Sequence, residues 1–141
     1  TQISIAELFT DLKKLFPEEE FQFEVPSPEL KLNVDRTQIE QILINLLKNA
    51  REACSRKSDK KIQVKARKLS AGNTTLTISD NGEGILPDVL DKIFVPFFTT
   101  KTSGSGIGLS LCKQIMTLHE GSINVKSEVG KGSSFILTFP K

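Results

Sequence analysis

The 141-residue sequence has few of the residues that build disulfide scaffolds, zinc clusters or membrane spans. Its two cysteines, Cys54 and Cys112, form no CxxC pair and no cluster with histidine. We therefore expect two buried, reduced thiols in the cytoplasm and no structural zinc. The apolar runs are far shorter than the roughly 20 residues that cross a bilayer, and no signal-peptide pattern is present. We accordingly expect no direct contact of this domain with a membrane.

Charge is nearly balanced, with 19 basic and 17 acidic residues and a net charge of +2. A dedicated nucleic-acid binder needs clustered positive charge, so we expect no nucleic acid as partner. Binding of a single nucleotide stays open. The length and the 38% hydrophobic content fit one globular domain over residues 1–141. Because the chain begins with Thr1 rather than Met, we expect it to be a piece of a longer protein.

The apolar spacing predicts helices and strands that alternate along the chain. The expected helices are 4–16, 35–55, 87–93 and 107–118, and the expected strands are 21–25, 61–69, 74–80, 122–127 and 134–139, with a short extended piece at 30–34. Asp35 and Gln38 have the spacing of a capping box at the start of the long helix. Together these elements predict an α+β fold, a two-layer α/β sandwich with a mixed, mostly antiparallel sheet and helices on one face.

Two asparagines interrupt the apolar pattern of the long helix. Asn45 and Asn49 stand four residues apart and so lie on one side of it. An amide oxygen is a hard, neutral ligand that suits Mg²⁺ shared with the phosphates of a nucleotide. Taken alone, the pair is more simply explained as two side chains on a wet edge of the helix.

A strand delivers Asp80 to the turn that contains Gly82 and Gly84. The glycines let the backbone turn sharply and approach a ligand, and an ionised carboxylate selects a partner that offers hydrogen-bond donors. A turn without any ligand explains this segment equally well.

A third glycine-containing segment, Gly104–Leu109, opens a helix. Free N–H groups and the helix dipole make such an end an anion site. It is neither a Walker A loop nor a Rossmann loop, and a flexible hinge is the alternative.

The order and spacing of these segments carry more information than each segment alone. Asn45–Ala50, Asp80–Ile85, Phe94–Thr99 and Gly104–Leu109 resemble the N, G1, F and G2 boxes of the histidine kinase catalytic domain. Residues 119–123 and 130–135 are similar to its last two strands. The family belongs to a superfamily whose Bergerat-type ATP fold also occurs in gyrase, mismatch-repair ATPases and a chaperone. The ending of the third box, Phe98–Lys101, is similar to the nitrogen-regulation type.

The resemblance implies ATP and Mg²⁺ as cofactors and assigns roles to individual residues. Asn49 would coordinate Mg²⁺ with Asn45 supporting it, Asp80 would bind the adenine amine, and residues 94–106 would form a mobile ATP lid. The full set of implied ATP-binding residues is Asn49, Asp80, Gly82, Gly84, Ile85, Lys101, Gly104, Gly106, Ile107, Gly108, Leu109 and Ser133. The implied partners are a histidine-bearing dimerisation domain of the same kinase and, indirectly, a response regulator.

Two features depart from the pattern of many family members: Glu52, and the short segment between Phe98 and Gly104, which predicts a compact lid. Glu52 stands where many members have a phosphate-contacting lysine, and Lys48, Arg51 and Lys101 are the candidates to replace it. Asn45 stands where the ATPase branches have a water-activating glutamate, so we expect no efficient ATP hydrolysis.

Three alternatives stay open: an anti-sigma-type serine kinase, an ATPase of the gyrase or chaperone type, and a binding module without nucleotide affinity. The only histidine, His119, follows a helix at a Glu-Gly turn, and we expect it not to be a phosphoacceptor. The isolated chain should therefore not phosphorylate itself.

Overall fold

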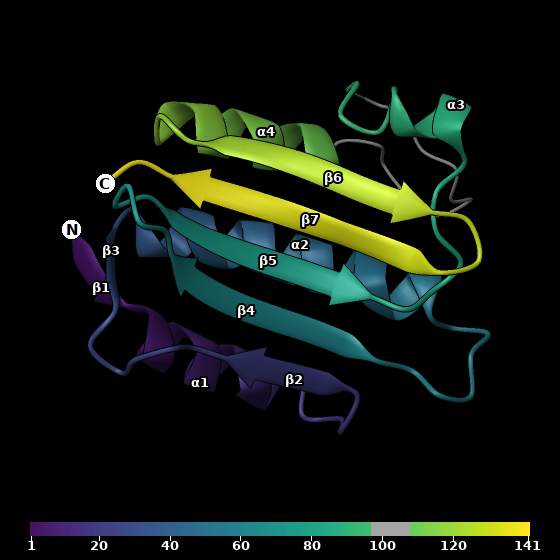
Figure 1. The fold of residues 1–141 in the computed structure, drawn as a ribbon, viewed down its shortest axis with the longest axis horizontal. Coiled ribbons are helices and arrows are strands. Elements are labelled where there is room, and N and C mark those ends of the chain that lie inside the picture. The colour runs from purple at the N-terminus through teal and green to yellow at the C-terminus, as the bar shows by residue number, and fades with distance from the viewer. Residues whose placement is uncertain (97–107) are drawn as a thin grey trace.

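A computed structural model describes residues 1–96 and 108–141 as two layers, a sheet and the helices that cover it (Figure 1). The elements are β1 (Gln2–Ser4), α1 (Ile5–Leu15), β2 (Phe21–Glu24), β3 (Lys31–Asn33), α2 (Arg36–Ala53), β4 (Ile62–Lys68), β5 (Thr74–Asp80), α3 (Pro87–Leu90), α4 (Gly108–Leu118), β6 (Ser122–Glu128) and β7 (Gly132–Phe139). The predicted α+β class, with a mostly antiparallel sheet, is confirmed.

The main sheet has five strands in the order β2-β4-β5-β7-β6. Only the β2–β4 pair is parallel, and the other three pairs are antiparallel. β1 and β3 form a separate antiparallel pair. The register of β5 and β7 places Asp80 opposite Ser133 and Ser79 opposite Ser134. The ends of β5 and β6 and the start of β7 therefore meet at one edge of the fold (Figure 1).

Local signals in the sequence explain where the long helices begin. The Asp35 carboxylate accepts a hydrogen bond of 3.0 Å from the Gln38 N–H, which confirms the predicted N-cap of α2. Ser4 caps α1 in the same way through the Glu7 N–H. The apolar side of α2 is then fully buried against the sheet and its neighbouring helices, with Ile39, Ile42, Leu43, Leu46 and Leu47 at most 1% exposed. Cys54 and Cys112 are both buried, as predicted.

Most element boundaries differ from the sequence prediction by one or two residues, and two elements differ more clearly. The predicted helix 87–93 begins at Pro87 as expected but ends at Leu90 and continues as turns, because none of its four residues is buried against the core to stabilise a longer helix. β7 begins two residues earlier than predicted, at Gly132. β1 was not predicted, because a three-residue strand has too short a pattern to recognise.

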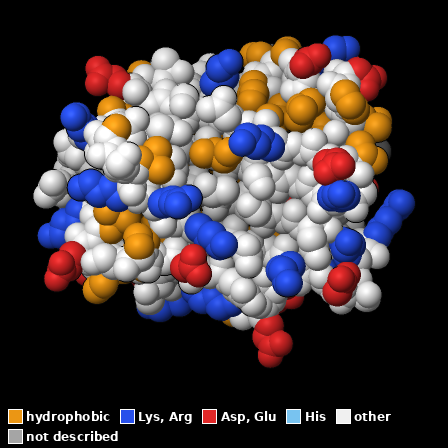
Figure 2. Space-filling view, viewed as in Figure 1, with side chains coloured by type: hydrophobic (Ala, Val, Ile, Leu, Met, Phe, Trp, Pro, Cys, Tyr) orange, Lys and Arg blue, Asp and Glu red, His pale blue; other side chains and the backbone are white. Residues whose placement is uncertain are grey.

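The two faces of the sheet differ in what covers them. The helices lie on one face (Figure 1), and the other is open and carries charged and polar side chains (Figure 2). Exposed apolar side chains gather near α3 and the β6–β7 turn, where Leu86, Val95 and Val129 are 49–55% exposed. None of the helices in the described ranges is long and apolar enough to cross a membrane.

Candidate functional site

Asp80 stands at the end of β5, on the face that the helices cover. Its Oδ1 accepts a hydrogen bond of 2.9 Å from the Gly82 N–H. Burial raises the pKa of the Asp80 carboxyl above its ordinary value, and the backbone N–H groups of Gly82 and Ser133 counteract part of this rise. A partly buried carboxylate that two protein donors hold is a strong acceptor for a further donor.

The two glycines after Asp80 are required by contacts with the protein itself. A Cβ atom on Gly82 would lie 2.5 Å from the carbonyl oxygen of Ala53, at the end of α2. Gly84 has a φ of +78°, and a Cβ there would lie 2.4 Å from the carbonyl oxygen of Glu128. The loop is thus packed between the end of α2 and the β6–β7 turn. These contacts fix the position of Asp80 relative to both.

Sequence reasoning missed Ser127, which joins this loop to β7. Its Oγ accepts a hydrogen bond of 2.7 Å from the Ile85 N–H and lies 2.9 Å from the Oγ of Ser133. Ser133 is only 6% exposed. The available signal was the alternation of β6: Ile123 and Val125 predict that residue 127 also points inward, and a serine at an inward position is a polar group that needs a partner.

Both predicted asparagines lie on α2, and Asn45 faces the start of α4. Asn45 Nδ2 lies 3.5 Å from the carbonyl oxygen of Gly108, the first residue of α4. Asn45 Oδ1 accepts a hydrogen bond of 3.1 Å from Gln41 Nε2. Asn49 is half-buried one turn further along the helix. The fold therefore brings α2 and the first turn of α4 together at Asn45.

The basic residues proposed to replace the missing lysine occupy different places. The Arg51 guanidinium donates a hydrogen bond of 2.9 Å to the Glu18 carboxylate, and its Cζ lies 4.9 Å from the centroid of the Phe16 ring. Arg51 therefore points toward the α1 side of the molecule. This contact removes Arg51 from the candidates. Lys48 is exposed on α2.

Several predicted site residues lie outside the described residues, and so does most of the predicted lid. They are Lys101, Gly104, Gly106 and Ile107. Phe94, the first residue of the predicted lid, is half-buried, and the centroid of its ring lies 5.8 Å from Lys113 Nζ.

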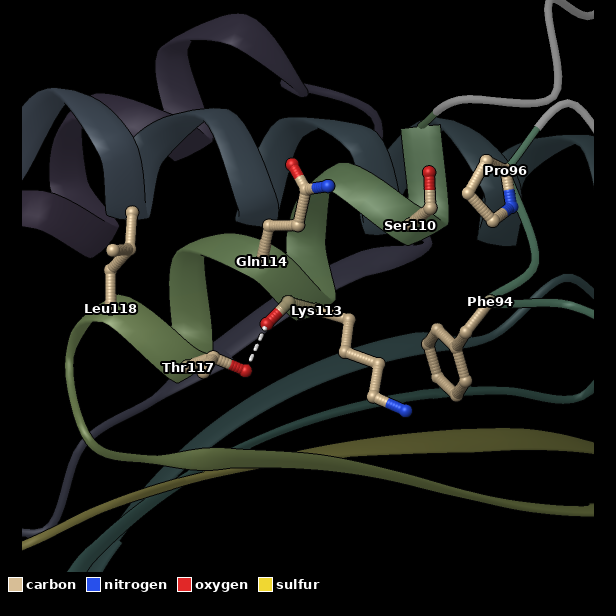
Figure 3. Close-up of a pocket in the computed structure, with 7 residues that line it drawn as sticks. All are labelled: Phe94, Pro96, Ser110, Lys113, Gln114, Thr117 and Leu118. Carbon is tan, nitrogen blue, oxygen red and sulfur yellow. Dashed lines mark hydrogen bonds between the residues drawn. The ribbon is translucent and has the colours of Figure 1, made fainter.

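An open cavity of about 520 Å³ lies beside Phe94 and Pro96 on α4 (Figure 3). Its other lining residues are Ser110, Lys113, Gln114, Thr117 and Leu118. At 100° per residue, these positions lie on the side of α4 opposite to Gly108 and Cys112, which contact Asn45. The cavity is therefore separate from the Asp80 and Asn49 region.

His119 has both ring nitrogens engaged within the protein. Its Nε2 accepts a hydrogen bond of 3.1 Å from the Asp35 N–H, because a backbone amide can only donate. Nδ1 must then carry the proton and donate to the Ile115 carbonyl oxygen, 2.8 Å away. His119 thus joins the end of α4 to the N-cap of α2.

The donor set of this region fits a Mg-nucleotide. Asp80 and Ser133 supply acceptors and a hydroxyl at the strand ends, and the two asparagines supply hard amide oxygens. Cys112, beside Asn45, does not compete as a ligand, because burial raises the pKa of its thiol to about 11.

Comparison with known proteins adds independent findings. Residues 34–141 match the family described as histidine kinase-, DNA gyrase B-, and HSP90-like ATPase. Sensor histidine kinase ZraS of Salmonella typhimurium is 39% identical over 110 residues, which are 78% of this chain and 23% of that protein. The chain therefore spans about a quarter of the length of this relative.

Solved structures resemble the whole chain. The catalytic domain of histidine kinase ThkA, in a nucleotide-free form, is 35% identical with a TM-score of 0.87, covering 100% of this chain and 95% of that one. A structure of ThkA in complex with response regulator protein TrrA is 31% identical with a TM-score of 0.79, covering 100% of this chain and 41% of that one.

Proposed function

Because this chain belongs to the family of histidine kinase-, DNA gyrase B- and HSP90-like ATPases, we propose that it is the ATP-binding catalytic domain of a sensor histidine kinase. It binds Mg-ATP and donates the γ-phosphate to a histidine on a separate dimerisation helix in two-component signal transduction. The observation that carries the proposal is the Asp80 carboxylate, held at the covered end of β5 by the N–H groups of Gly82 and Ser133.

At the base end of the site, Asp80 accepts a hydrogen bond from the exocyclic amine of adenine. Gly82, Gly84 and Ile85 form the wall of this pocket, because their loop is fixed against α2 and the β6–β7 turn. Ser133, paired with Asp80 in the register, adds a hydroxyl beside the same edge of the base.

At the phosphate end, Asn49 supplies an amide oxygen to Mg²⁺, which neutralises phosphate charge when bound. Asn45 holds the first turn of α4 in place through the Gly108 carbonyl. Gly108 and Leu109 then present the N-terminus of an 11-residue helix to the phosphates. Lys101, Gly104, Gly106 and Ile107 complete the proposed contacts, with residues 94–106 as the lid.

The proposed partner is the histidine-bearing dimerisation domain of the same kinase. The cavity between Phe94 and the outer side of α4 combines the apolar Phe94, Pro96 and Leu118 with polar side chains of α4, which suits an amphipathic helix of that domain (Figure 3). Phosphotransfer to a response regulator follows indirectly, by analogy with the ThkA–TrrA complex. Both cysteines are free thiols, in keeping with work in the cytoplasm.

Hydrolysis by this domain is disfavoured because no carboxylate occupies position 45, where an ATPase needs a base for water. The Asn45 oxygen already accepts from Gln41, and an amide has no basic lone pair at neutral pH.

Titration with ATP, in the presence and absence of Mg²⁺, tests the binding half of the proposal. We expect saturable binding that Mg²⁺ strengthens, and ATP should compete far better than GTP. Equal affinity for ATP and GTP would contradict the role of Asp80 in base recognition. Absence of ATP binding would favour the alternative of a binding module without nucleotide affinity.

A further inference from the structure

The Ser127 hydroxyl joins the end of β6 to the loop after Asp80, through a hydrogen bond with Ile85, 42 residues away in the sequence. Ser127 Oγ accepts from the Ile85 N–H at 2.7 Å, lies 3.2 Å from the Gly132 carbonyl oxygen and lies 2.9 Å from Ser133 Oγ. Ile85 ends the loop that follows Asp80, and Ser133 is the β7 residue opposite Asp80. The ends of these strands lie together in Figure 1.

Hydrogen-bond accounting limits what this hydroxyl can do. Ser127 has one proton and two lone pairs, and the Ile85 N–H uses one lone pair. When its proton goes to the Gly132 carbonyl, Ser133 must donate to Ser127, and Ser133 then offers only acceptors to a ligand. When its proton goes to Ser133, the Ser133 proton is free for a ligand. Ser127 therefore sets which role the Ser133 hydroxyl plays.

The same two segments also hold the Asp80 carboxylate. One backbone donor is Gly82, in the loop, and the other is Ser133, on β7. The Gly130 N–H, which donates to the Glu83 carbonyl at 2.9 Å, is a second tie between the loop and the β6–β7 turn. Ser127 is the side chain that closes this arrangement next to Asp80, so its loss should let the two donors move apart.

We propose that Ser127 is a positioning residue for purine recognition: it holds the two backbone donors of Asp80 in place and orients the Ser133 hydroxyl. The proposal rests on the proposed nucleotide-binding function. Its consequence is specific, because a displaced carboxylate loses discrimination at position 6 of the purine as well as overall affinity.

The experiment compares ATP with ITP, which has the same purine frame but a carbonyl in place of the 6-amine. One net hydrogen bond contributes roughly 0.5–1.5 kcal/mol, or about two- to ten-fold in affinity. We expect S127A to lower the ratio of ATP to ITP affinity by about this factor. S127T keeps a hydroxyl and should retain the wild-type ratio. S127C keeps the volume with a weaker donor and should fall with S127A, which provides a second variant if S127A does not fold.

Matched controls separate positioning from a general loss of stability. Ser134 makes a similar hydroxyl pair with Ser79 at 2.8 Å, but on the open face of the same strands. S134A removes that bond and should leave the ratio unchanged, whatever it does to the melting temperature. In a double-mutant cycle, S127A and S133A should be non-additive for ATP binding.

The outcomes distinguish this inference from the function on which it rests. A wild-type chain that prefers ATP to ITP, with S127A and S127C showing the same preference, overturns the role of Ser127 alone. An equal loss of ATP and ITP affinity in S127A, with additive effects in the cycle, also overturns it by assigning Ser127 a structural role only. A wild-type chain without preference for ATP overturns both proposals.

Discussion

The two faces of strands β5 and β7 carry different side-chain pairs at neighbouring positions. On the open face, Ser79 and Ser134 hydrogen-bond to each other at 2.8 Å. One residue further along each strand, Asp80 and Ser133 lie on the face that the helices cover. There a carboxylate is partly buried and its pKa is raised. The strand register is continuous across both faces, but the covered face carries an acidic residue where the open face carries a serine.

The difference between the two faces suggests that the acidic residue on the covered face serves a ligand. Partial burial of a carboxylate costs stability unless its lone pairs find donors. Protein donors satisfy part of this need at Asp80, and an exposed position would have needed none of them. A serine pair like that of the open face would occupy the same strand positions with a smaller desolvation penalty. We therefore infer that the acidic residue is kept for a ligand, at some cost to the stability of the fold.

The largest expected effect is the loss of folding stability when Gly132, at this end of the sheet, is replaced by alanine. A Cβ on Gly132 would lie 2.0 Å from the Asp80 carbonyl oxygen, at a φ of +127°. We expect G132A to lower the free energy of unfolding by roughly 3 kcal/mol, from overpacking and backbone strain together. Gly130 also has positive φ, +84°, but open space around it. Its alanine variant should cost only about 1–2 kcal/mol. Urea unfolding compares the two, and equal costs would contradict the steric explanation.

The next effect concerns nucleotide affinity. Asp80→Ala removes a charged acceptor, whose hydrogen bond contributes about 1.5–3 kcal/mol. ATP and ADP should bind roughly ten- to a hundred-fold more weakly, with the fold retained. Ser79→Ala, on the open face, should change affinity less than two-fold, roughly the low end of one neutral hydrogen bond. Calorimetric titration of both variants checks this, and similar losses in both would break the contrast between the faces.

A third variant tests the metal. Asn49→Ala removes a hard oxygen ligand but leaves a better helix former in α2. We expect normal circular dichroism and a loss of roughly ten-fold or more in the Mg²⁺-dependent part of ATP affinity. Asn124→Ala, on the open face of β6, is the matched asparagine control. If ATP binding by the Asn49 variant keeps its full response to Mg²⁺, then Asn49 is only a helix-surface residue.

The smallest effect is the pH dependence of stability. Because the folded pKa of Asp80 is raised, its contribution to stability is present below the unfolded pKa and is lost as pH rises through the folded pKa. ATP binding should run the other way and weaken as pH falls through that raised pKa, since the protonated acid is no longer a pure acceptor. Asp80→Asn should therefore melt at a higher temperature than wild type at neutral pH, and the difference should vanish in acid. A lower melting temperature for Asp80→Asn at neutral pH would contradict the assigned direction.

Much of the fold could be predicted because its signals are local. The N-cap of α2 needs only Asp35 and Gln38, and β5 has its predicted bounds because Asn81-Gly82 ends it. Gly82 and Gly84 could be predicted as turn residues that let the backbone approach a ligand, but not as residues packed against the backbone of Ala53 and Glu128. The predicted resemblance to histidine kinase catalytic domains is confirmed by the family match and by the ThkA structures. The similarity to the nitrogen-regulation type stays a prediction.

What could not be predicted depends on contacts between distant parts of the chain. Arg51 was a phosphate candidate until the fold placed it on Glu18, 33 residues away. Ser127 had no motif, and its importance arises only because Ile85 and Ser133 both reach its hydroxyl. The roles of Asp80, Asn45 and Asn49 stay proposals, because they concern contacts with a nucleotide and its metal ion.

Transfer of labelled γ-phosphate is the most direct test of the account. The chain would be incubated with Mg²⁺ and γ-labelled ATP, alone and with a histidine-bearing dimerisation hairpin of a matching kinase. We predict acid-labile label on the hairpin and none on the chain, because both ring nitrogens of His119 are engaged by Asp35 and Ile115. Acid-labile label on the isolated chain, abolished by His119→Ala, would contradict the account, and so would a hairpin that stays unlabelled while the chain is saturated with Mg-ATP.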